Sequence, residues 1–204
     1  MASHVIEHMP WLISFLQSAE ELPREDGIIS LAIPDKRREY DLLKPISTTA
    51  DAIDAHLDKR TRHTARTAFL AYFYECTTHS SGKWSGVPHI RDVSFANAFD
   101  EAKGLFNKLM ESENSAYSDF HAWFFTPASF QLILLELKAL GYINLEIIEI
   151  SETEGCEFFV YLKWTYIMVN QTMQYIKHYN ETNGAPFNFR SATHTRNNDW
   201  RNDT

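Results

Sequence analysis

The first residues of the chain hold its densest group of side chains that could do chemistry. His4, Glu7 and His8 have the spacing H-x-x-E-H, with which inverted zinc peptidases bind their metal. That motif needs both histidines on one face of a continuous helix. Pro10 follows Met9 directly, however, and the β-branched residues between His4 and Glu7 favour a strand. We therefore do not expect a peptidase.

These residues form one of two polar groups that each follow a predicted strand. The first group follows a short strand at the amino terminus, residues 2–6. The second follows the apolar run 28–33, whose β-branched residues are typical of a buried parallel strand. Ligands of open α/β sheets bind beyond the carboxyl ends of parallel strands. We therefore expect a single crevice, lined by Ser3, His4, Glu7 and His8 and by Asp35, Lys36 and Arg37.

Composition excludes several classes of function. The 204 residues suffice for one large domain, and a net charge of −8 gives no overall field that would attract nucleic acid or an anionic membrane. No apolar stretch is long enough to span a bilayer, and residues 11–16 lack the basic segment of a signal peptide. Only two cysteines, Cys76 and Cys156, are present, which favours a reducing compartment. The expected location is the cytoplasm.

Glycine is scarce, which limits the kinds of ligand loop in this sequence. The seven glycines include no G-x-G pair. Loops that cradle phosphates in P-loop and dinucleotide-binding folds need closely spaced glycines. Such loops are therefore excluded within these residues.

Apolar periodicity and helix-capping residues predict the elements that must position the polar groups. A helix over 11–22 precedes the strand 28–33, and Thr126 and Pro127 begin a second helix that Gly141 ends. The segment 34–120 is predicted to be a mostly helical insertion. In it, Thr48 and Asp51 resemble a capping box, Phe69, Tyr72 and Phe73 share a helix face, a third helix starts near Ser94, and 80–88 is a loop.

The carboxyl-terminal part of the chain is predicted to change from strands to a polar tail. Residues 143–150 and 156–163 are spaced as an antiparallel hairpin. Residues 164–179 could continue as a helix, and 180–204 are expected to be largely disordered. The sequence therefore predicts an α/β domain over 1–163.

Several of these segments, in this order, resemble class I S-adenosylmethionine-dependent methyltransferases. The resemblance covers the family's fold from the end of its fourth strand to its seventh, and therefore implies the carboxyl-terminal half of a Rossmann-like, doubly wound sheet whose last strand is antiparallel. The matching segments are residues 2–10, 16–34, 51–63, 121–130 and 155–160.

The resemblance implies methyl transfer from S-adenosylmethionine to an oxygen or nitrogen of a small molecule or glycan. It places Ser3, His4 and Glu7 near the cofactor, His8 or His4 as the base, and Asp35, Lys36, Arg37, His121 and Trp123 near the acceptor. Structural roles remain open for the same residues: a braced turn for Glu7 and His8, a solvated loop for Lys36 and Arg37, and core packing for Trp123 beside His121.

Two departures from the family pattern qualify this expectation. The family's glycine-rich loop and ribose-binding acid would lie before Met1, so this chain alone is expected to be inactive. Some members bind a divalent metal through Glu-x-x-Glu-His at this turn, but His4 stands where the first Glu would be. No metal is therefore expected.

A non-catalytic role is the alternative. A half-fold of this kind would leave Ile28, Ile29, Leu31 and Ile33 poorly covered, at a cost of about 1.5–3 kcal/mol each. An open sheet edge pairs readily with another strand. The alternative is therefore an interaction partner that self-associates or assembles with a complementing chain.

Overall fold

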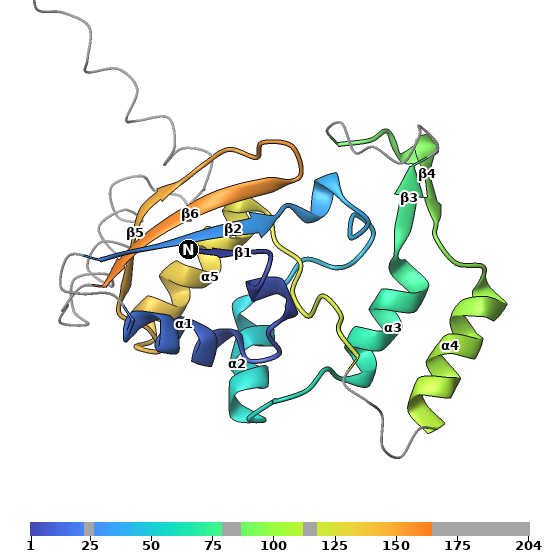
Figure 1. Cartoon of the computed structure of the whole chain (residues 1–204), viewed down its shortest axis with the longest axis horizontal. Coiled ribbons are helices and arrows are strands. Elements are labelled where there is room, and N and C mark those ends of the chain that lie inside the picture. Colours follow the sequence, from blue (N-terminus) through green and yellow to red (C-terminus); the bar gives the residue numbers. More distant parts are fainter. Residues whose placement is uncertain (23–26, 79–86, 112–117, 165–204) are drawn as a thin grey trace, which may run out of the picture. The chain divides into compact units, whose positions relative to one another are not determined.

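A mixed four-stranded sheet carries the candidate site. The computed structural model describes residues 1–22, 27–78, 87–111 and 118–164 (Figure 1). Among them, β1 (Ala2–Ser3) is parallel to β2 (Ile28–Pro34), and β6 (Glu157–Trp164) is antiparallel both to β2 and to β5 (Leu145–Ile150). The strand order is β1-β2-β6-β5, and the predicted α/β class is confirmed.

The two neighbours of β2 cover it unequally. All seven of its residues pair with β6, whereas only Leu31 and Ala32 pair with β1. Leu31 and Ile33 are buried, but Ile28 is 59% exposed. The expectation of poor cover along the whole strand is wrong, because the carboxyl-terminal hairpin supplies a full-length partner. Among the described residues, the sheet has two edges: β1 with the uncovered start of β2 on one side, and β5 on the other.

Three helices pack with the sheet around one apolar core: α1 (Leu12–Glu20), α2 (Thr49–Leu57) and α5 (Pro127–Ala139) (Figure 1). Alternate residues of β6 face this core, which agrees with the period of two in a strand. The buried members of the core are Leu12, Ile13 and Leu16 from α1, Ala52 and Ala55 from α2, Phe130, Ile133, Leu134 and Leu137 from α5, and Leu31, Ile33, Leu145, Phe158, Val160 and Leu162 from the strands, with Ile6, Trp123, Phe125 and Ile143 from the connecting segments.

The α5 helix has the start and the end that its sequence predicts. Thr126 and Ser129 form a capping box with Pro127 in the first turn. Gly141 follows the helix with a φ of 79°, in the left-handed region where glycine has no steric penalty. Its buried residues are Phe130, Ile133, Leu134 and Leu137. This helix fixes the segment just before it, which contributes to the site.

The inserted segment contains one feature that was not predicted. Between α3 (Ala65–Tyr74) and α4 (Phe99–Glu111), β3 (Cys76–Thr78) pairs with β4 (Val93–Phe95). The helix expected near Ser94 therefore begins at Phe99. Strands of three residues are too short to show a period of two. The predicted capping box at the start of α2 is present.

Some predictions fall outside the described residues. These are the helix over 164–179, the tail over 180–204 and most of the loop 80–88. The chain divides into two units after Thr165, and only the first contains described residues.

Candidate functional site

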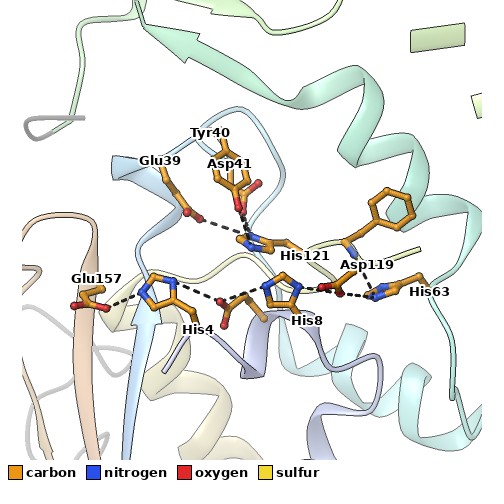
Figure 2. Close-up of polar contacts among 11 residues, drawn as sticks. His4, His8, Glu39, Tyr40, Asp41, His63, Asp119, His121 and Glu157 are labelled. Carbon is orange, nitrogen blue, oxygen red and sulfur yellow. Dashed lines mark hydrogen bonds and ion pairs between the residues drawn. The ribbon is translucent and has the colours of Figure 1, made fainter. Parts of the chain in front are cut away.

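Three segments of the chain meet beyond the carboxyl ends of β1 and β2. Residues 4–8 follow β1, residues 35–44 follow β2, and residues 119–125 lead into α5. The Glu7 carbonyl accepts a hydrogen bond from the Trp123 N–H at 3.2 Å, which joins the first and third segments. Figure 2 shows side chains of the three segments close together: His4 and His8 from the first, Glu39 and Asp41 from the second, and Asp119 and His121 from the third.

The turn after β1 sets the directions of its three polar side chains. His4 has a φ of 50°, in the left-handed region that residues other than glycine seldom adopt. Ile6–His8 is a single turn of 3₁₀ helix, in which Glu7 is buried and His8 is half-buried. No continuous helix holds His4 and His8, so the H-x-x-E-H residues do not form a peptidase site.

Glu7 has a buried carboxylate that accepts no hydrogen bond. Its side chain is 0% exposed, and neither oxygen has a hydrogen-bond partner among the described residues. The nearest histidine nitrogens are Nδ1 of His4 at 3.7 Å and Nε2 of His8 at 3.8 Å. Burial raises the pKa of Glu7, and its own backbone N–H and the nearby histidines only partly offset this. A carboxylate in this position is costly unless a cation or a donor reaches it.

Asp119 orients the ring of His8 from the side away from Glu7. Its Nδ1 lies 3.0 Å from Oδ1 of Asp119, while Nε2 faces Glu7. The His8 ring meets the ring of His121 edge-on, with centroids 4.6 Å apart. His8 therefore presents Nε2 toward the buried part of the site.

His121 has a hydrogen-bond partner for each ring nitrogen. Nδ1 lies 2.6 Å from Oδ2 of Asp41, and Nε2 lies 2.9 Å from the hydroxyl of Tyr40 (Figure 2). An ionised carboxylate can only accept, so Nδ1 carries the proton. Glu39 lies 3.9 Å from the same nitrogen, and Asp41 also pairs with the buried Lys44. The polar network around His121 is thus largely enclosed.

The pKa values of the two acids beside His121, Glu39 and Asp41, are shifted in opposite directions. Burial and the nearby charge of Asp41 raise the pKa of Glu39 to about 10, which keeps Glu39 neutral at physiological pH. Burial would also raise the pKa of Asp41, but the hydrogen bond with His121 and the charge of Lys44 lower it overall. One of the two acids is therefore protonated and the other ionised.

Two sets of donor atoms are close enough to share a cation. Glu7, His8 and His121 form one set, and Glu39, Asp41 and His121 form the other. Within each set, one donor atom of each residue lies within 4.8 Å of the others. His121 belongs to both sets and is the link between them.

His4 stands at the exposed side of the site. Its side chain is 41% exposed, and its Nε2 lies 2.7 Å from Oε2 of Glu157 on β6. Its Nδ1 is the nitrogen that faces Glu7. This pairing of a carboxylate with an imidazole holds the ring and leaves one nitrogen available.

The residues predicted to contact the acceptor after β2 are held in local structure. Asp35 is buried, caps the 3₁₀ turn Lys36–Arg38 and accepts hydrogen bonds from the guanidinium of Arg37 and the hydroxyl of Thr153. Lys36 is buried and donates to the Leu42 carbonyl at 2.7 Å. These contacts brace the turn and leave little of Lys36 exposed to a ligand.

Of the remaining predicted residues, Trp123 is buried and Ser3 is exposed. Trp123 is 4% exposed, belongs to the core, and donates from Nε1 to the Met9 carbonyl. Ser3 is exposed in β1, next to His4. Trp123 therefore packs in the core, which is the structural role left open for it above.

Sequence reasoning did not identify several members of the polar cluster: Glu39, Tyr40 and Asp41 after β2, Asp119 before α5, and Glu157 on β6. The charged run after β2 continues beyond Arg38 through Glu39 and Asp41, and this was an available signal. Glu157 and Asp119 gave no such signal, because their roles depend on contacts across more than 100 residues of sequence.

An open hollow adjoins the site. It is lined by Pro10, Asp51, Arg60, Arg62, His63, Thr64, Arg66, Thr67, Ala122 and Trp123. Three arginines and His63 make the hollow basic, and Ala122 and Trp123 place it near the segment that carries His121. Two of its arginines are close to acids, Arg60 to Asp58 at 2.8 Å and Arg66 to Asp51 at 3.8 Å.

Two findings concern the kind of protein to which the chain belongs. In the part of the chain that the structure describes, no helix has the length and apolar character needed to cross a membrane. Comparison of the chain with protein-family models, with curated proteins and with solved structures gives no match.

Proposed function

We propose that this chain forms the acceptor side of a class I S-adenosylmethionine-dependent methyltransferase that methylates an oxygen or nitrogen of a small molecule or glycan. The observation that carries the proposal is the place of the polar cluster in the sheet. β1, β2 and β5 run parallel in succession, with antiparallel β6 between β2 and β5. A doubly wound sheet orders strands four to six in this succession and binds ligands at their carboxyl ends, where the cluster lies.

The described residues supply only part of the cofactor site. S-adenosylmethionine supplies the methyl group when it is bound. Glu7, expected near the cofactor, is buried beneath the turn, which leaves Ser3 and His4 exposed there. The sequence also has no G-x-G pair for the methionine end of the cofactor. We infer that residues other than those described here hold most of the cofactor.

Within this proposal, His4 accepts the proton of the acceptor. His8 and His4 were both predicted for this role, and their geometry favours His4. Both rings turn one nitrogen toward buried Glu7, but the side chain of His4 is 41% exposed against 27% for His8 and is therefore the more accessible to an acceptor. Glu157 holds Nε2 of His4, so Nδ1 is the nitrogen that takes the proton.

Calorimetry and a transfer assay test this function together. The 204-residue chain should bind S-adenosylmethionine weakly, and tight one-to-one binding would contradict the half-site. A complex or longer protein that supplies a glycine-rich loop should transfer labelled methyl groups to hydroxyl or amine acceptors. In that protein, His4→Ala should lower turnover by about 10²–10⁴-fold without changing cofactor affinity. The exposed His89 provides the control variant His89→Ala, and equal turnover in the two variants would exclude His4 as the base.

The open edge favours a second candidate function, that of a strand-pairing partner. Among the described residues, β1 covers two of the seven residues of β2 and leaves its own outer side unpaired. Unpaired backbone groups at an edge recruit another strand. Sedimentation velocity tests this candidate, because association that increases with concentration would support it and a monomer at every concentration would contradict it.

A further inference from the structure

We propose that Glu7, His8 and His121 bind one first-row transition-metal ion. Their donor atoms lie within 4.8 Å of one another, although His121 is 113 residues from His8 in the sequence. The earlier expectation that no metal binds rested on the turn 4–8 alone. His121 provides a third donor that the local motif could not reveal.

The buried state of Glu7 is independent support for a cation. Its carboxylate is 0% exposed, lies among the proposed ligands, and has no hydrogen-bond partner within the described residues. Native proteins rarely leave a buried polar group without a partner, and a bound ion is a recognised reason for such a group. A bound cation would satisfy both oxygens.

The second coordination layer is already built for both histidines. Asp119 holds Nδ1 of His8, and Asp41 holds Nδ1 of His121 at 2.6 Å. Metal-binding histidines in proteins usually have such a carboxylate on the nitrogen that does not bind the metal. In His121 the other nitrogen contacts the Tyr40 hydroxyl, a neutral group that an ion could replace.

The charges around the site also favour a cation. Asp41 is paired with Lys44 and His121, and Glu39 is neutral, which leaves Glu7 as the buried acid whose oxygens have no hydrogen-bond partner among the described residues. Buried charges need a partner or a metal. One divalent ion would supply the missing positive charge.

The donor set selects the kind of metal. Two imidazoles and one carboxylate suit manganese, iron, cobalt, nickel or zinc, whereas magnesium and calcium prefer oxygen ligands. Three protein ligands leave open positions for ligand oxygens. This last step rests on the proposed function: a hydroxyl of the acceptor would occupy an open position, where the ion lowers its pKa, and would pass its proton to His4.

Cobalt binding tests the site without any assay of activity. The metal-free full chain should bind Co²⁺ one to one, with visible d–d absorption, and Zn²⁺ should displace it while excess Mg²⁺ should not. Glu7→Gln keeps the size of the side chain and should fold, but it should weaken Co²⁺ binding at least tenfold, as should His8→Ala. Asp119→Asn should weaken binding by about 10–100-fold, whereas the exposed control His89→Asn should not change it.

The possible outcomes separate this inference from the proposed function. Absence of stoichiometric Co²⁺ binding, or binding that Glu7→Gln and His8→Ala leave unchanged, would overturn the metal site. Co²⁺ binding with the expected losses would support it, even if no methyl transfer were found. In that case only the methyltransferase proposal would fail.

Discussion

Asp35 is the residue on which the shape of the second polar segment depends. Its buried carboxylate accepts hydrogen bonds from the Arg37 backbone and guanidinium and from Thr153. Asp35→Ala removes all of them, and we expect a loss of about 1.5–3 kcal/mol in the free energy of unfolding, measured by urea denaturation. Burial alone would raise the pKa of Asp35, but these hydrogen bonds lower it below its ordinary 3.8. The stabilisation should therefore be present above about pH 4 and disappear as the pH falls through the lower pKa of the folded state.

A second Asp–Arg pair of the same spacing provides the control. Asp58 and Arg60 also lie two residues apart, but the Asp58 side chain is 61% exposed. Asp58→Ala should cost about 0–1 kcal/mol, because solvent screens an exposed pair. Equal losses in the two variants would show that the buried contacts of Asp35 contribute nothing.

Single residues also show how far sequence could predict the site. The H-x-x-E-H spacing drew attention to His4, Glu7 and His8, and the resemblance added His121. Their partners Asp41 and Asp119 depend on how distant segments meet, which neither residue type nor local spacing encodes. Asp35, by contrast, was predicted near a ligand because charged loops after strands often bind one. Its position after β2 fits a ligand contact and a structural cap equally well.

Among the elements, the buried face of α5 is expected to contribute strongly to the free energy of unfolding. Leu137 is 0% exposed in the core, while Leu132 on the same helix is 36% exposed. Leu137→Ala should lower the free energy of unfolding by about 2–5 kcal/mol, because it leaves a cavity. Leu132→Ala is the matched control and should cost well under half as much. Similar losses in both would mean that α5 is not anchored as described.

The same elements explain which parts of the fold were predictable. Thr126, Pro127 and Gly141 mark both ends of α5, so its limits could be derived from local chemistry. The run 28–33 predicted β2, but the sequence did not reveal that β6 would pair with its full length. The β3–β4 pair was missed because its register depends on tertiary contacts and its strands are only three residues long.

For the molecule as a whole, the β1 edge of the sheet is expected to govern association. If β1 recruits another strand, Ser3→Lys should weaken self-association at least tenfold in sedimentation experiments, because a lysine on an edge strand opposes pairing. Ser18→Lys makes the same change on the exposed surface of α1 and should leave association unchanged. Equal weakening by both would point to net charge as the cause, and not to the edge.

The turn after β1 holds His4 in the left-handed backbone region, which costs conformational energy. At a φ of 50°, glycine would fit with less steric conflict, so His4→Gly would relieve the backbone but remove the imidazole from the site. Any engineering of this protein for heat resistance would meet that trade-off first at its fourth residue.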